Sequence, residues 1–158
     1  MPRTPTTRRL HNRRERGQAL VEFSLVVVPF VILLMAVIDL GRGIYMMNGT
    51  SEAARDIARA TSVHITDSSG NVGFSPETQQ SVSTQRKLIP DLTIDPAVDI
   101  VCVDAYDVVL ADTSCKPGTA DDPVFIKVRV TAPFAPITPL VSAFGAHTFE
   151  STTRMEIR

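Results

Sequence analysis

A glycine and a carboxylate separated by four residues are the first groups in this chain with a distinct chemistry. Gly17 ends a basic stretch, and Glu22 lies two residues inside an apolar segment that starts at residue 20. An ionised acid within a membrane helix costs about 3 kcal/mol at the bilayer centre and less near either end. Water or lipid headgroups near the helix end offer one explanation of how Glu22 is tolerated.

Cleavage after Gly17 offers a second explanation of Glu22. Gln18 would then carry a free α-amine, and Glu22 would be the fifth residue of the mature chain. A carboxylate in that position can neutralise the N-terminal amine of a neighbouring subunit as both enter an apolar bundle. Pairing removes most of the penalty for burying either charge. Gly17 and Gln18 therefore form a candidate processing site, and Glu22 is a candidate for setting how neighbouring helices pack.

The apolar segment that carries Glu22 is long enough to cross a membrane. Residues 20–40 contain only two ionisable side chains, Glu22 and Asp39. At 1.5 Å rise per residue they form about 31 Å of helix, close to the hydrocarbon thickness of a bilayer. A cleaved secretory signal is the alternative, but it has a shorter apolar region and a small-residue cleavage site. Residues 38–42 contain no such site, so we expect a single transmembrane helix.

The charge distribution predicts the orientation of this helix. Residues 1–16 contain six arginines and one glutamate, a net charge of +5, whereas the remainder of the chain has a net charge of −6. Basic residues beside a span stay on the cytoplasmic side. We expect a single-pass membrane protein, with its N-terminus in the cytoplasm and everything after Arg42 outside. An arm that binds nucleic acid is disfavoured because no aromatic residues accompany the arginines, and the lipid bilayer is the expected partner.

Beyond the span, the sequence predicts that the helix continues toward an external head. Asp39 and Arg42 are spaced i and i+3 and are expected to pair at the outer membrane interface. Gly49 is expected either to bend the helix or to precede a second segment capped by Ser51. A narrow apolar strip follows and is expected to pack against the head; it consists of Ala53, Ala54, Ile57 and Ala58.

Four motifs occur in order in the N-terminal part of the chain. They are Gly-Gln-Ala-Leu-Val-Glu-Phe-Ser-Leu-Val at residues 17–26, Pro29, Asp-Leu-Gly-Arg at 39–42 and Ala-Ala-Arg-Asp-Ile-Ala-Arg at 53–59. The first resembles the processing site of type IV prepilins in the short form of the Flp/Tad branch. Together the motifs resemble the TadE-like family of minor pseudopilins of the Tad (Flp) tight-adherence pilus system. The resemblance covers residues 13–60, and residues 137–139 agree only loosely. Leu40 replaces a residue that is often aromatic in that family.

The resemblance implies a structural role and a set of partners. A prepilin peptidase, which is a membrane aspartic enzyme, would cleave after Gly17, while Glu22 and Phe23 would guide helix packing. The other implied partners are pilin-like subunits and the Tad inner-membrane machinery. Gly17 has no side chain to block the approach of the peptidase, and the basic leader suits the anionic cytoplasmic surface. The protein is then the substrate of an enzyme and is not expected to be one.

The part of the chain outside the membrane predicts one small domain. Residues 62–76 are rich in turn formers, and Ser75 and Pro76 predict the start of a helix that ends by Ile89. Strands are expected at residues 98–103, 124–130 and 147–157, with a fourth candidate at 106–110; Pro133, Pro136 and Pro139 are expected between the second and third strands. The expected fold class is α+β, with a single N-terminal transmembrane helix extended into a pilin-like head that holds a small antiparallel sheet. Its predicted divisions are a leader (1–17), a span (18–42), a helix extension (43–61) and the head (62–158).

Two cysteines outside the membrane are candidates for a disulfide. Cys102 and Cys115 would close a 14-residue loop, which is worth about 3 kcal/mol in the chain-entropy model. The histidines show no ligand spacing with these cysteines or with each other. The many aspartates between residues 91 and 122 lack the register of a calcium loop, so a solvated acidic face is favoured over a metal site. No catalytic motif is present, and no cofactor is expected.

Two functions therefore remain open from the sequence. The first is a TadE-like minor pseudopilin that is cleaved after Gly17 and helps to build a Tad pilus. The alternative is an unprocessed single-pass protein whose external domain serves as a binding module or scaffold. The identity of the mature N-terminal residue distinguishes the two.

Overall fold

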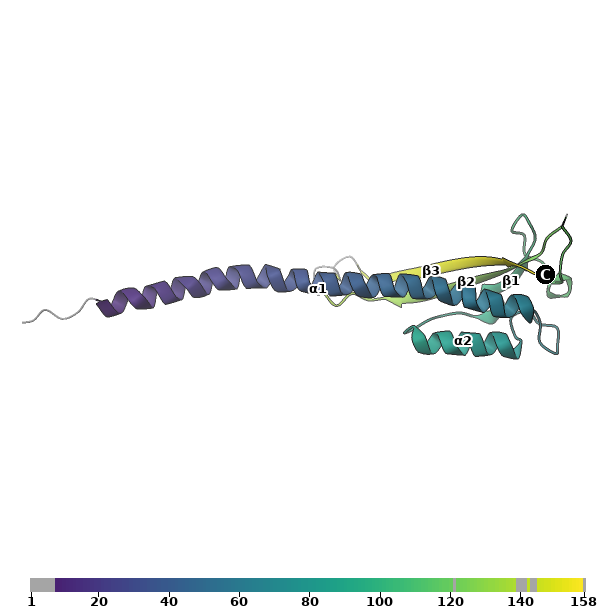
Figure 1. The fold of residues 1–158 in the computed structure, drawn as a ribbon, viewed down its shortest axis with the longest axis horizontal. Helices are drawn as coiled ribbons and strands as arrows, with labels where there is room; N and C mark the ends of the chain where they lie inside the picture. The colour runs from purple at the N-terminus through teal and green to yellow at the C-terminus, as the bar shows by residue number, and fades with distance from the viewer. Residues whose placement is uncertain (1–7, 121, 139–141, 143–144, 158) are drawn as a thin grey trace, which may run out of the picture.

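One long helix dominates the computed structural model, which describes residues 8–120, 122–138, 142 and 145–157. Helix α1 (Arg8–Val63) contains 56 residues, or about 84 Å of helix. Its N-terminal half projects away from the head, and its C-terminal half is part of the head (Figure 1). The predicted extension of the apolar helix into a head is confirmed.

The helix is continuous at Gly49, so the predicted second segment capped by Ser51 is wrong. The Ser51 hydroxyl donates to the Met47 carbonyl oxygen at 3.1 Å, within the helix, and does not cap a new segment. A Cβ atom at Gly49 would lie 3.3 Å from the side chain of Ile89. The glycine therefore allows the chain after the next helix to approach α1 closely.

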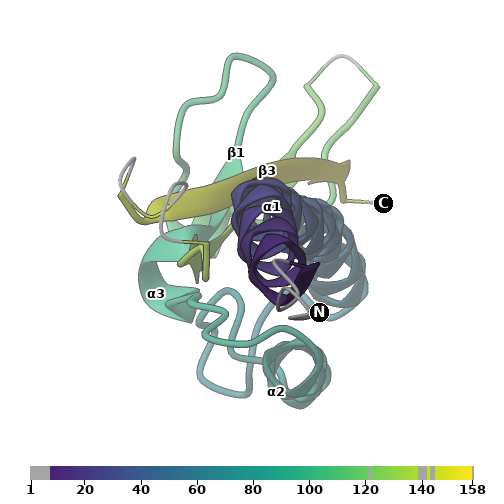
Figure 2. The ribbon, with the colours of Figure 1, turned by 90° about the vertical axis from the view of Figure 1, so that its left-hand side faces the viewer.

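The head contains a three-stranded antiparallel sheet in the order β1-β2-β3. The strands are β1 (Ile100–Val103), β2 (Phe125–Phe134) and β3 (His147–Glu156). Figure 2, viewed along α1, shows that the helix lies against the sheet and that α2 lies on the side of α1 away from it. The predicted α+β class is confirmed.

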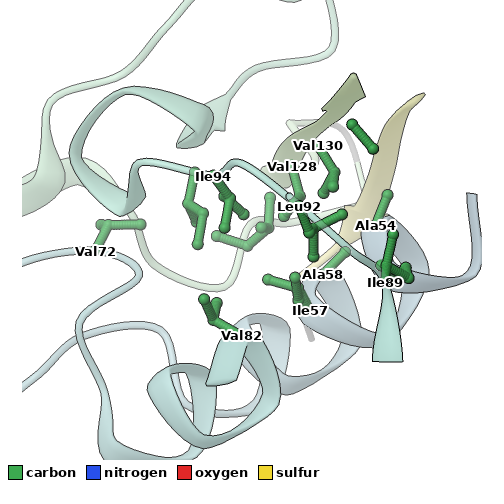
Figure 3. Packing of buried hydrophobic residues seen from close by; sticks show 14 of the residues in the cluster. Ala54, Ile57, Ala58, Val72, Val82, Ile89, Leu92, Ile94, Val128 and Val130 are labelled. Carbon is green, nitrogen blue, oxygen red and sulfur yellow. The ribbon is translucent and has the colours of Figure 1, made fainter. Parts of the chain in front are cut away.

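The core forms where α1 meets the sheet. The apolar strip of α1 is completely buried, which confirms that it packs against the head. Alternation along β2 places Ile126, Val128 and Val130 on the buried face, as period-2 patterning predicts. Small side chains on the helix let its backbone approach these branched residues, and Figure 3 shows Ala54, Ala58, Val128 and Val130 in one cluster.

Helix α2 (Pro76–Leu88) agrees with the predicted segment. The Ser75 side chain accepts a hydrogen bond from the Thr78 amide at 3.3 Å, and Pro76 occupies the first turn. Thr61 and Thr78 share a buried hydroxyl hydrogen bond of 3.1 Å at one end of the helix pair. At the other end the Tyr45 hydroxyl donates to the Leu88 carbonyl oxygen at 3.3 Å. The two helices therefore run antiparallel, and the C-terminal end of α2 lies toward the exposed part of α1.

The strand predicted at residues 98–103 is confirmed as β1 from residue 100 onward, but its first two residues are helical, and the fourth candidate strand is wrong. Residues 96–99 form the short helix α3 (Pro96–Asp99), because the Asp95 side chain caps it by accepting from the Ala97 amide at 3.0 Å. The fourth candidate strand, residues 106–110, has only an isolated bridge to β1. Asp104 accepts from the backbone amides at positions 106 and 108 and so makes a turn there.

Strand β2 continues farther than predicted and includes Pro133. This proline pairs with Thr148 of β3, so its expected position between strands is wrong. Strand β1 covers β2 only as far as Val128, and Thr93 makes one further bridge to Thr131. Among the described residues, no strand therefore pairs at Pro133 with the edge of β2 that faces away from β3. The missing N–H of the proline costs no hydrogen bond between strands there.

Candidate functional site

The predicted processing and packing residues lie on the exposed part of α1. The Gln18 side-chain amide donates to Oε1 of Glu22 at 3.1 Å, one helical turn away. A Cβ atom at Gly17 would meet nothing within 4 Å, and Phe23 is 65% exposed. These four residues share one stretch of helix, far from the head (Figure 1). Their predicted roles require partner molecules.

The same half of α1 meets the criteria for a membrane-spanning helix. Its most apolar 18 residues have a mean hydropathy of 2.7, and none of them is buried in the structure. A soluble core helix would bury this surface, whereas a membrane helix leaves it to lipid. The helix is consistent with a single-pass membrane anchor or with a signal sequence.

Asp39 and Arg42 are paired, but Asp39 has stronger partners in the head. The guanidinium lies 3.3 Å from the carboxylate, in the predicted i, i+3 arrangement. Asp39 is only 4% exposed. Its carboxylate accepts from the amides of Ile137 and Thr138 at 3.1 and 2.7 Å and from the Thr138 hydroxyl at 2.5 Å. We call this arrangement the Asp39 clamp, defined by Asp39, Arg42, Ile137 and Thr138.

The Asp39 clamp joins the head to α1 at the level where the apolar helix enters it. The segment after β2 leaves the sheet with two consecutive N–H groups that require an acceptor, and one carboxylate satisfies both. Arg42 neutralises that carboxylate while its guanidinium lies 5.5 Å from the centre of the Phe134 ring, a cation–π arrangement. The arrangement attaches the segment after β2 to α1.

Sequence reasoning missed the head half of the clamp. Ile137 and Thr138 are 98 and 99 residues from Asp39 in the chain, so no local spacing connects them. The only signal was the loose family agreement at residues 137–139. Pro139 itself lies outside the described residues.

The two cysteines are brought together near the far end of the sheet. Cys102 lies in β1, and Cys115 follows the short 3₁₀ helix η1 (Asp112–Ser114). Their Cα atoms are 5.7 Å apart and their sulfurs are paired, a separation that suits a disulfide. We propose that the pair is oxidised outside the membrane.

Replacing both Cys102 and Cys115 with serine should lower the free energy of unfolding of the head by about 3 kcal/mol, because the unfolded chain regains the entropy of an open loop. Chemical denaturation of the full chain in detergent micelles measures this loss. Adding reductant to the parent protein should reproduce it and should leave the double variant unchanged. Two reactive thiols on non-reduced protein would contradict the pairing.

The loop enclosed by this pair is held against the sheet by charge. Asp107 has a positive φ of 69°. It accepts a hydrogen bond from Lys127, and Arg154 lies 3.9 Å away. The Lys127 hydrogen bond, with a smaller contribution from the charges of both cations, holds the pKa of Asp107 below its usual value. Within the described residues no group of three or more metal-ligating side chains is positioned to bind a metal ion.

The N-terminal part of the chain matches a known family. Residues 17–59 match the family model described as TadE-like protein. Neither the curated proteins nor the solved structures contained a match to the chain. The matched region begins at Gly17, includes Asp39 and Arg42, and ends with the apolar strip of α1. Residues 17–59, which include the apolar part of α1, are therefore TadE-like in sequence.

Proposed function

We propose that the protein is a TadE-like minor pseudopilin, a membrane-anchored structural component of a Tad (Flp) pilus. The observation that carries this proposal is the family match that begins at Gly17 and continues along an apolar helix with no cover from its own head. Exposed apolar surface on this scale requires either a bilayer or other apolar helices. A pseudopilin uses both environments in turn.

Maturation would require a prepilin peptidase acting after Gly17. The surroundings of Gly17 support this assignment, since a Cβ atom there would meet nothing within 4 Å. The basic leader would remain at the cytoplasmic face and the head would face outward. The chain is thus a substrate and a building element, and its other partners would be pilin-like subunits and the Tad inner-membrane machinery.

The mature N-terminus tests this function. The protein is purified from membranes of cells that express the Tad system, and its intact mass and N-terminal sequence are determined. A chain that begins with Gln18 supports the pseudopilin. A chain that retains residues 1–17 in the presence of an active prepilin peptidase contradicts processing, and it favours an unprocessed membrane-anchored scaffold or binding domain.

Glu22→Gln should leave membrane insertion intact and impair pilus assembly. The change removes the negative charge that would neutralise a neighbouring N-terminal amine while keeping the size of the side chain and its bond to Gln18. Membrane fractionation measures insertion, and counting pili by electron microscopy measures assembly. Glu52→Gln is the matched control, because Glu52 is an exposed acid on the same helix within the head. Normal piliation in Glu22→Gln would exclude the packing role.

A further inference from the structure

An apolar groove of about 630 Å³ lies beside the Asp39 clamp, where α1 meets the ends of β2 and β3. We call it the proximal groove. Its helix side is formed by Ala36, Leu40, Gly43 and Met47, and its sheet side by Phe134 and Phe149. Gly43 has no side chain to fill the space, and the two rings, 5.6 Å apart, form the opposite wall.

The proximal groove is continuous with the exposed apolar surface of α1. Leu40 is 65% exposed and Met47 is 59% exposed, although both lie at the level of the head. The helix from Leu20 to Met47 is about 40 Å long, which exceeds the hydrocarbon core of a bilayer by about 10 Å. The excess must be covered by lipid that rises along the helix or by another apolar partner.

The charges around this end of the head favour lipid as the cover. Arg42, His147 and Lys87, at the end of α2, are exposed there, and Asp91 is the acid that lines the neighbouring depression with Arg42. No acidic residue occurs between residues 40 and 51. Asp104 and Asp107, by contrast, lie at the far end of the sheet, beside Arg154. Asp39, which lines the groove, is buried and paired with Arg42. The exposed charges at this apolar end are therefore Arg42 and Lys87 beside Asp91, an arrangement that can accept lipid phosphates.

We propose that this end of the head docks on the outer leaflet and that the proximal groove holds an acyl chain of an anionic phospholipid, with its phosphate near Arg42 and His147. The inference rests on α1 crossing the membrane, as in the proposed function. Docking of the head would hold it at a defined height above the bilayer before any assembly step. The competing occupant is the helix of a second copy.

The chain contains no tryptophan, so single tryptophan substitutions report on one position each. Met47→Trp reports on the groove and Ile137→Trp on the neighbouring exposed surface. Phe30→Trp is the reference within the span, and Tyr106→Trp is the reference at the far end of the head, where Tyr106 is 88% exposed. Each full-length variant is reconstituted in vesicles of phosphatidylcholine and phosphatidylglycerol whose acyl chains carry bromine, and its fluorescence quenching is measured.

We expect quenching of Met47→Trp and Ile137→Trp to be comparable with that of Phe30→Trp, and Tyr106→Trp to remain unquenched. Bromine placed only on phosphatidylglycerol should quench Met47→Trp more than bromine placed only on phosphatidylcholine. Adding Arg42→Gln and Lys87→Gln should reduce that preference, by up to about fivefold for each charge removed. Glu52→Gln in the same background is the control and should leave the preference unchanged.

Three results have distinct meanings. Quenching of Phe30→Trp without quenching of Met47→Trp would overturn the lipid groove and leave the membrane anchor intact. Blue-shifted Met47→Trp fluorescence that bromine does not reach would likewise overturn it and identify a protein occupant, which cross-linking between copies would reveal. Absence of quenching at Phe30→Trp would reject the span itself, and with it both the proposed function and the lipid groove.

Discussion

Gly17→Leu should leave the chain at its full length, with residues 1–17 still attached. A branched side chain at the cut would displace the peptide bond from the carboxylates of the peptidase, and a displacement of about 1 Å can slow a reaction about 100-fold. The surroundings of Gly17 argue against a folding defect as the cause, because a Cβ atom there would meet nothing within 4 Å. Intact mass measured after expression with a prepilin peptidase gives the processed fraction.

Gly41→Leu is the matched control for this experiment. Gly41 is also within α1, and a Cβ atom at that position also meets nothing within 4 Å. Processing should therefore be normal in Gly41→Leu. A normal mature mass for Gly17→Leu would contradict the assigned cleavage site, whereas loss of processing in both variants would indicate a general effect on membrane insertion.

Asp39→Ala should release the segment after β2 from α1. The amides of Ile137 and Thr138 lose their acceptor, and a buried N–H without an acceptor is destabilising. Arg42 also loses its partner beside the Phe134 ring. We expect the melting temperature of the head to fall by roughly 5–15 °C. Hydrogen exchange at residues 137 and 138 should accelerate more than exchange in the centre of β2.

Two further variants separate the parts of the Asp39 clamp. Thr138→Val removes only the hydroxyl bond and should have a smaller effect than Asp39→Ala, while Asp39→Asn should be intermediate because one amide oxygen remains to accept. Glu52→Ala changes an exposed acid on the same helix and should leave exchange unchanged. Unaltered exchange at Ile137 and Thr138 in Asp39→Ala would show that the Asp39 clamp does not hold the segment.

The order of these effects distinguishes the clamp from a simple surface ion pair. An exposed Asp–Arg pair contributes little to stability, and disrupting it from either side should have similar small consequences. In the Asp39 clamp the carboxylate is buried whereas the guanidinium side chain is 46% exposed. Arg42→Gln should therefore destabilise the head less than Asp39→Ala.

Local patterns predicted much of the architecture. The length and composition of residues 20–40 were sufficient to predict an apolar helix that projects from the head, because a membrane span is recognised from one continuous segment of the chain. The Ser75 cap with Pro76 predicted the start of α2, because capping depends on neighbouring backbone groups. Alternation in residues 124–130 identified the buried face of β2, and the motifs between residues 17 and 59 identified the family.

Non-local contacts decided where those predictions failed. Pro133 is tolerated within β2 only because β1 is too short to cover it. Gly49 and Ser51 suggested the start of a second helix, yet α1 is continuous there and Ile89 packs against the glycine. Each outcome depends on which segment packs alongside, and single-sequence patterns do not contain that information.

By itself, the sequence determined the apolar helix, the position of Glu22 five residues after Gly17, and the match of residues 17–59 to the TadE-like family. These features depend on residues that are neighbours in the chain. Only the tertiary structure decided that Asp39 is buried against residues from the segment after β2, and that Gly43 and Phe134 border a groove at the base of the head. Both arrangements join residues about 90 to 100 positions apart, and folding of the sheet onto α1 is what brings them within contact distance.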